Sequence, residues 1–214
     1  MITYTIRKHY PNCVNAYGAT LGQEHMEPLQ EMIRQRLCGE GGRQVMPTET
    51  VLLDFSGIES TSASYLKALV LPLLTYREPT PSEKAGRSDS TFDLPQGIFP
   101  LVTGLTQEVR EELEEVLRAR SLPCLEALDW SQDRVCCAHL LGGMESVLVT
   151  TFLLLIREKA ASATQLYCKY QGEQITITGW NNRLADLHRL RLATRRKEGR
   201  QWIYEPITAE VDNG

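Results

Sequence analysis

Apolar and polar positions change their spacing several times along the first part of the chain. Ile2, Tyr4 and Ile6 alternate with polar residues, the stretch RKHYPN has the composition of a turn, and residues 17–21 alternate again. Alternation on both sides of a turn predicts a β-hairpin. Over residues 24–37 apolar side chains recur every three or four positions, which is typical of an amphipathic helix, and the following GEGG offers glycine for its end.

Strand and helix patterns then alternate up to about residue 140. The run TVLLDF at 50–55 is continuously apolar, as in a strand buried on both faces, and residues 60–74 have a helical spacing that Pro72 should kink or end. Three more segments follow: a strand at 97–102, a helix at 106–120 with Thr106 as its cap, and a strand at 134–141. Strands that alternate with helices indicate an α/β fold, with a mixed sheet covered by helices.

The last third of the chain has the pattern of three helices followed by two short strands. Its segments are an apolar helix at 147–156, a short helix at 162–174, a helix at 178–190, and strands at 192–196 and 201–205 around a turn at Gly199. In the helix at 178–190, Trp180, Leu184 and Leu187 share one face and should point inward. The ten apolar residues 147–156 fall short of the roughly 20 that span a bilayer, so we expect a buried helix and no membrane segment.

These patterns divide the chain into two units. Residues 1–141 form the α/β unit, in which the proline-rich stretch 77–96 is expected to be a mobile surface loop. Residues 142–208 form the second unit, and residues 209–214 are expected to be a flexible tail.

Charge is unevenly distributed between the two parts of the chain. The whole chain has a net charge of -4, yet residues 161–214 contain 8 basic and 6 acidic residues, a net charge of +2. The first 160 residues therefore carry a net charge of -6. A change of sign along the chain indicates two units with different partners.

Sequence motifs for catalysis or metal binding are absent. The six cysteines form no C-x-x-C pair, the four histidines have no partner at metal or catalytic spacing, and no phosphate loop, dinucleotide fingerprint or G-x-S-x-G motif occurs. We therefore expect a protein that is not an enzyme and has no metal or cofactor. The cysteine usage and the lack of a signal peptide favour reduced thiols in the cytoplasm.

Positive charge gathers in the stretch ITITGWNNRLADLHRLRLATRR…GRQWIYEP. Residues 144–206 resemble a winged helix-turn-helix domain in their capped helix, their Leu-x-x-Leu-x-Leu exit and their basic wing. The resemblance implies binding of double-stranded DNA, with cations of the helix and wing on the phosphates and Asn or Arg on the base edges. The residues expected to contact DNA are Thr178, Asn181, Asn182, Arg183, Arg189, Arg195, Arg196, Lys197 and Arg200.

Two positions depart from an ideal DNA-binding helix of this family. Such domains usually have glycine where the helix ends, and this chain has Arg191, for which a left-handed backbone conformation costs about 1 kcal/mol. Asp186 also points outward, where it would repel phosphates.

A second resemblance lies in the stretch VLLDFSGIESTSASYLKAL, which has the order strand, glycine, Ser/Thr-rich turn and helix. It resembles the STAS domain (sulfate transporter and anti-sigma-factor antagonist), especially its shorter STAS-like relatives, and the likeness extends over roughly residues 1–140. In antagonist members of that family, a partner kinase phosphorylates a serine at this helix start. Ser62 matches that position best and Ser64 comes next. The alternative is that Ser60, Thr61 or Ser62 only caps the helix.

The two resemblances leave two functions open. The first is a transcription regulator that binds duplex DNA through the winged helix and uses the STAS-like domain for partner binding or for dimerisation, a homodimer being one arrangement. The second is a protein-interaction adaptor, in which both domains dock onto a partner such as a histidine-kinase-like ATPase without binding DNA. Duplex binding that weakens steeply with salt separates the two functions.

Overall fold

A computed structural model of the chain describes residues 1–37, 49–75, 97–131 and 134–212. The predicted loop at 77–96 and the glycine-rich stretch that follows the first long helix lie outside the described residues. Among the described residues, no helix has the length and apolar character that crossing a bilayer requires.

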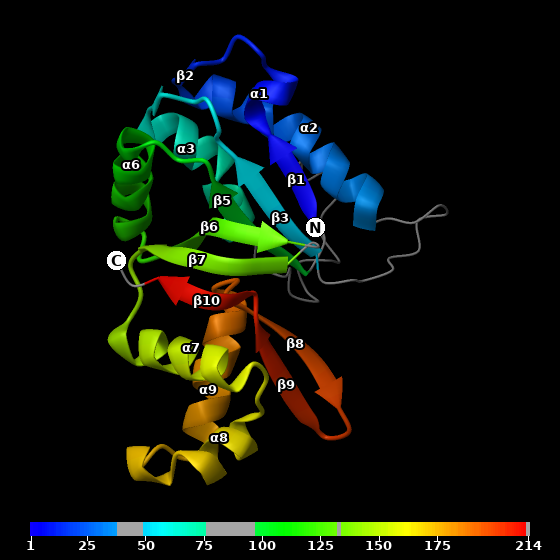
Figure 1. The fold of residues 1–214 in the computed structure, drawn as a ribbon, viewed down its shortest axis with the longest axis vertical. Coiled ribbons are helices and arrows are strands. Elements are labelled where there is room, and N and C mark those ends of the chain that lie inside the picture. Colours follow the sequence, from blue (N-terminus) through cyan, green and yellow to red (C-terminus); the bar gives the residue numbers. More distant parts are fainter. Residues whose placement is uncertain (38–48, 76–96, 132–133, 213–214) are drawn as a thin grey trace, which may run out of the picture.

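A six-stranded sheet forms the centre of the molecule (Figure 1). Its order is β1 (Ile2–Thr5), β3 (Glu49–Asp54), β5 (Ile98–Thr103), β6 (Pro123–Ser131), β7 (Arg134–Gly142) and β10 (Thr208–Asp212). The first four strands are parallel, β7 is antiparallel to β6, and β10 is parallel to β7. The fold is therefore mixed α/β, with a mainly parallel central sheet covered by helices, as the alternation of strands and helices predicted.

The first part of the chain supplies the helices on one side of this sheet. They are α1 (Ile6–His9), α2 (Ala19–Leu37), α3 (Ala63–Leu69), α4 (Leu71–Leu74) and α6 (Gln107–Arg118), with a small parallel pair of strands, β2 (Asn15–Ala16) and β4 (Ser60–Thr61). The helical segment is interrupted between α3 and α4 at Val70, two residues before Pro72, as the proline predicted.

The last part of the chain supplies the other side. It contains α7 (Ser146–Glu158), α8 (Ala163–Lys169), a 3-10 turn η1 (Gln171–Glu173), α9 (Ile177–Arg189) and a two-stranded ribbon of β8 (Ala193–Glu198) and β9 (Gln201–Pro206). Figure 1 shows α2, α3 and α6 on one side of the sheet and α7 and α9 on the other. The three helices and the ribbon thus match the predicted order of elements.

Side chains on the two faces of the sheet belong to two separate hydrophobic cores. Val51 and Leu53 of β3 lie in the core beneath α2, α3 and α6, whereas Leu52 lies in the core beneath α7 and α9. All three are fully buried. Because successive residues of a strand point to opposite faces, a continuously apolar strand has to be covered on both sides.

The predicted β-hairpin at residues 2–21 is wrong. Strand β1 pairs in parallel with β3, and the residues from Ala19 onward belong to α2. Residues 17–21 are too few to distinguish alternation from a helical spacing, in which Leu21 precedes the fully buried His25 by one turn.

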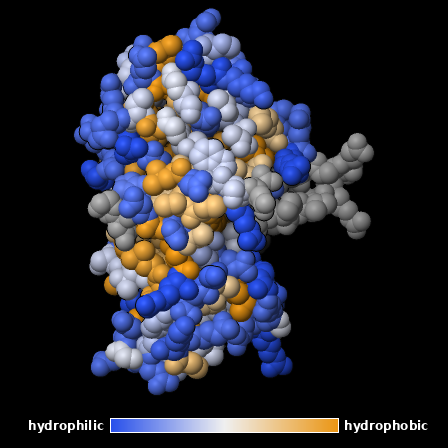
Figure 2. Space-filling model, viewed as in Figure 1, coloured by the Kyte–Doolittle hydropathy of each residue, from blue (hydrophilic) through white to orange (hydrophobic). Residues whose placement is uncertain are grey.

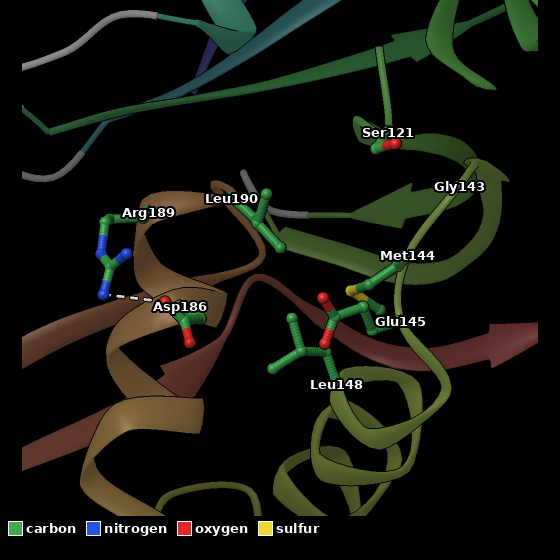
Figure 3. Close-up of a pocket in the computed structure, with 8 residues that line it drawn as sticks. All are labelled: Ser121, Gly143, Met144, Glu145, Leu148, Asp186, Arg189 and Leu190. Carbon is green, nitrogen blue, oxygen red and sulfur yellow. Dashed lines mark ion pairs between the residues drawn. The ribbon is translucent and has the colours of Figure 1, made fainter. Parts of the chain in front are cut away.

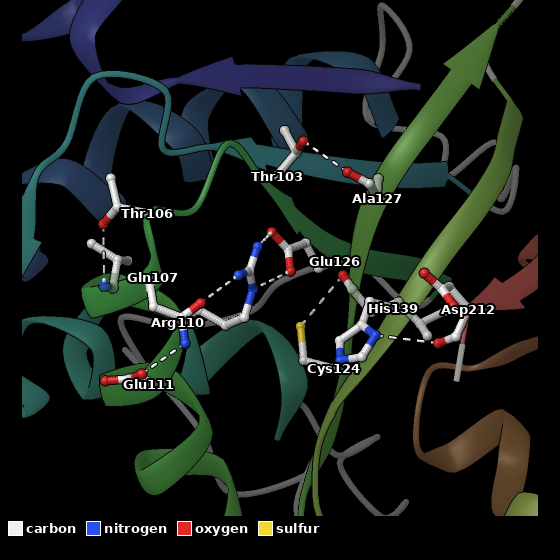
Figure 4. A network of polar contacts seen from close by, with 12 residues as sticks. Thr103, Thr106, Gln107, Arg110, Glu111, Cys124, Glu126, Ala127, His139 and Asp212 are labelled. Atoms are coloured by element: carbon white, nitrogen blue, oxygen red, sulfur yellow. Dashed lines mark hydrogen bonds and ion pairs between the residues drawn. The ribbon is translucent and has the colours of Figure 1, made fainter. Parts of the chain in front are cut away.

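Strand β6 has no counterpart in the sequence pattern, because a charged residue interrupts its apolar run. Glu126 is buried, and Arg110 of α6 donates two hydrogen bonds to its carboxylate, from Nε to Oε2 at 2.8 Å and from Nη2 to Oε1 at 2.9 Å (Figure 4). The hydrogen bonds to Glu126 raise the pKa of Arg110. A two-point ion pair of this kind allows a carboxylate to occupy a central strand.

The end of the chain returns to the sheet. In place of the flexible tail predicted at residues 209–214, Thr208–Asp212 form β10, and residues 213–214 lie outside the described residues. Thr208 is buried, Val211 packs against the second core, and the carbonyl oxygen of Asp212 lies 3.2 Å from Nδ1 of His139 (Figure 4). Pairing with β7 therefore forms a strand from a segment whose short, polar sequence did not indicate one.

An aromatic cluster surrounds the buried imidazole of His25. Its ring stacks on Tyr10 with 3.8 Å between ring centroids, and its Nδ1 lies 2.8 Å from the Tyr65 hydroxyl. The Tyr4 hydroxyl donates to the His25 carbonyl oxygen at 2.9 Å. Burial lowers the pKa of His25 from its ordinary value of 6.5 and raises the pKa of Tyr4 and Tyr65, so the cluster is neutral at pH 7.

We predict that Leu52→Ala loosens the C-terminal helices more than the helices on the other face. The substitution should cost roughly 2–5 kcal/mol in the free energy of unfolding, measured in urea, because it leaves a cavity beneath α7 and α9. Hydrogen exchange should rise mainly in α7 and α9. The control is Val51→Ala on the opposite face, and equal exchange in both variants would contradict the two-core arrangement.

We predict that the free energy of unfolding falls as the pH drops below about 6.5 and that His25 contributes to this fall. Because the pKa of His25 is lower in the folded protein than in the unfolded chain, the unfolded chain binds a proton at His25 at a higher pH. Acid therefore favours unfolding. Urea unfolding at neutral and at acidic pH should show a smaller decrease for His25→Phe than for the wild type. If both proteins lose the same stability, His25 is not the titrating group.

Candidate nucleic-acid interface

Helix α9 is fixed to the second core by one face and exposes the other. Its N-cap is Thr176, whose Oγ1 accepts a hydrogen bond from the Gly179 amide at 3.1 Å. Trp180, Leu184 and Leu187 are buried, as their spacing predicted, and they belong to the core that also contains Leu52. Because the buried side chains hold the helix by that face, its first two turns present polar side chains to solvent.

The C-terminal end of α9 is held against β5. Arg191 adopts a left-handed conformation with φ of 64°, although it is not glycine, and the Leu192 amide donates to the Leu187 carbonyl oxygen at 2.9 Å. The Arg191 guanidinium lies 5.9 Å from the ring centroid of Phe99, and the His188 ring lies 5.8 Å from the same ring. Packing at Phe99 therefore offsets the backbone strain of about 1 kcal/mol and fixes the helix end to the sheet.

The β8–β9 ribbon has two faces of different charge. Directly opposed residues of an antiparallel pair share a face, so Arg195 lies with Tyr204, and Lys197 lies with Trp202. The other face carries Arg196, which forms ion pairs with Glu198 and with Glu205. The face of Arg195 and Lys197 is thus cationic, whereas the charge of Arg196 is neutralised.

A groove lies between this cationic face, α9 and the start of α8. The groove has a volume of about 510 Å³, and its lining includes Asn181, Asn182, Arg195, Arg200 and Trp202. Strand β9 also exchanges two hydrogen bonds with the α7–α8 connection: the Ala161 amide donates to Tyr204 at 3.0 Å, and the Tyr204 amide donates back at 2.9 Å. This pairing holds the first turn of α8 beside the ribbon, where Ser162, Ala163 and Thr164 line the groove.

The predicted DNA contacts fall into three groups. The groove brings together Asn181, Asn182, Arg195 and Arg200, and Lys197 is exposed on the same ribbon face. Thr178 is exposed in the first turn of α9, and the Arg183 guanidinium lies on its flank, 5.7 Å from the Trp180 ring centroid. Arg189 and Arg196 lie elsewhere, each paired with a carboxylate. The groove also contains Trp202, whose only sequence signal is its alternation with Tyr204 along a basic ribbon.

Arg189 lies at a second cavity, away from the groove. This cavity has a volume of about 580 Å³ and lies at the junction of the α7 start with the end of α9 (Figure 3). Arg189 forms an ion pair with Asp186 at 2.8 Å there, and Glu145 also lines the cavity. Asp186 therefore compensates Arg189 and does not face the groove, where it would have repelled phosphates.

Ser62 is the N-cap of α3. Its Oγ accepts hydrogen bonds from the Gly18 amide at 3.0 Å and from the Tyr65 amide at 3.4 Å, and it lies 3.0 Å from Oγ of Ser64. Ser62 is half-buried, whereas Ser64 is exposed. Ser62 therefore caps α3, and phosphorylation at either serine stays a prediction.

Comparison of the chain with protein-family models, with curated proteins and with solved structures finds no match. Within the described ranges, no group of three or more His, Cys, Asp or Glu side chains is arranged to hold a metal ion.

We predict that Ser62→Ala lowers the free energy of unfolding by about 1 kcal/mol, because the amides of Gly18 and Tyr65 lose their acceptor. Ser64→Ala is the matched control and should cost no more than about 0.5 kcal/mol, since its exposed hydroxyl caps no amide. Urea unfolding of both variants measures the difference. Equal losses would show that the Ser62 cap contributes no more than an exposed hydroxyl.

Proposed function

We propose that this protein binds double-stranded DNA through α9 and the cationic ribbon face, as a winged helix-turn-helix domain does. The observation that carries the proposal is the shared orientation of Asn181 and Asn182 with Arg195 and Arg200 around one groove. Three helices followed by a two-stranded ribbon are the elements that such a domain requires.

The charges of the groove suit a polyanion. Among the described residues, neither Lys197 nor Arg200 forms an ion pair with a carboxylate, and Arg195 lies over the Trp202 ring. None of the described residues that line the groove is acidic. The net charge of -4 therefore does not exclude binding, because, within the part of the chain that the structure describes, two arginines and no acidic residue line the groove.

Each part of the interface would then have a separate role. A helix of the diameter of α9 fits the major groove, where Asn side chains can form two hydrogen bonds with adenine. The ribbon cations would contact phosphates, which contribute affinity and orientation but no sequence information. The α/β unit, which we propose to be STAS-like, would bind a partner or form a homodimer.

A docking function is the second candidate, and exposed apolar side chains favour it. Val147 and Leu153 on α7 are 42% and 36% exposed. Figure 2 shows hydrophobic residues gathered across the middle of one face, over β10 and α7. Apolar surface of this kind marks protein contacts. In this docking function, a partner such as a histidine-kinase-like ATPase covers the apolar surface and the protein does not bind DNA.

We predict that Arg195→Ala with Arg200→Ala weakens duplex binding at least tenfold at low salt. The slope of log affinity against log salt should fall by about 2, since each lost phosphate contact removes about one released counterion. Fluorescence anisotropy with a labelled duplex from a random-sequence pool measures both quantities.

The matched control is Arg189→Ala with Arg196→Ala, which removes the same charge from residues already paired with carboxylates. Its affinity should stay within about threefold of wild type. An equal loss in both double variants would place binding outside the groove, and a wild-type protein that ignores the duplex at low salt would leave only the docking function.

A further inference from the structure

Trp202 is exposed in the middle of the proposed interface. It lies on the cationic face of β9, directly opposite Lys197, and its side chain is 41% exposed, whereas Trp180 of α9 is only 1% exposed. The Arg195 guanidinium lies 4.6 Å from the centroid of its ring. A cation over the ring restricts the orientation of the indole, and both side chains line the groove.

The neighbours of Trp202 offer the groups that a nucleotide requires. The amides of Asn181, Asn182 and Gln201 each provide donors and an acceptor, which suit the polar edge of a base. Arg200 lines the same groove and suits a phosphate. A flat aromatic surface, amides and a cation around one cavity are the groups that binding a single nucleotide requires.

The size of the groove limits which nucleotide can enter. A volume of about 510 Å³ falls in the range of small-molecule sites and cannot contain a duplex. A paired base within a duplex is stacked on both sides and has no free face to offer an indole. A base that is unpaired, or that lies at a frayed end, exposes its face and stacks on aromatic side chains.

We propose that Trp202 is a stacking platform for an unstacked base, so that the protein prefers duplex DNA with an unpaired nucleotide over a fully paired duplex. This inference rests on the proposed DNA binding. Helix α9 and the ribbon cations hold the duplex, and the neighbouring unpaired base enters the groove and stacks on the indole.

The test compares three labelled probes: a fully paired duplex, the same duplex with one extra unpaired thymidine, and the corresponding single strand. We expect the wild-type protein to bind the bulged duplex about tenfold tighter than the paired one, the size of effect that one stacked base produces. Trp202→Leu should lose this preference, so that its affinities for the bulged and the paired duplex differ by no more than about twofold. Trp202→Phe, which retains an aromatic face, should keep most of the preference.

Several outcomes overturn the inference. Equal affinity of the wild type for the paired and the bulged duplex does so while leaving the proposed DNA binding intact. An equal loss on both probes in Trp202→Leu, with thermal unfolding unchanged, shows that the indole only supports the ribbon. If the single strand binds as tightly as the bulged duplex, the paired part of the probe contributes nothing and the inference is wrong. If no probe binds at low salt, the proposed function fails and the inference fails with it.

Discussion

The central strands of this protein are apolar on both sides, and the rest of the structure depends on covering both. Leu52 in β3 and Leu101 in β5 point away from the first core, so helices packed on one face alone would leave them in water. Burying a leucine side chain contributes roughly 1.5–3 kcal/mol, which is a large share of the stability of a protein this size. The C-terminal helices are therefore a structural requirement of the sheet as well as a candidate binding unit.

The same packing determines where the candidate interface lies. Trp180, Leu184 and Leu187 attach one face of α9 to the second core, and the contacts at Phe99 attach its end to β5. The exposed face of the helix and the ribbon beside it are consequently held in one orientation relative to the sheet.

Sequence patterns predicted the elements with strong periodicity and missed those determined by distant contacts. The inward face of α9 and the caps at Ser62 and Thr106 follow from local spacing and hydrogen-bonding groups. Strand β6 could not be predicted, because Glu126 is tolerated only through Arg110 on another element. Alternation along β8 places Arg195 and Arg196 on opposite faces, but the β9 residues that share each face could be assigned only once the register of β8 and β9 was known.

Strands β7 and β10 are parallel neighbours, so no tight turn can join them, and a crossover of about a dozen residues is the minimum. In this chain the crossover is the whole stretch from α7 to β9. Deleting that stretch would remove the connection that brings β10 to the sheet. Cutting the chain after β7 would leave each fragment with an apolar surface that the other fragment normally covers. The two parts of the chain are therefore interwoven. We expect them to be expressed as folded protein, exchanged between proteins and inherited only together.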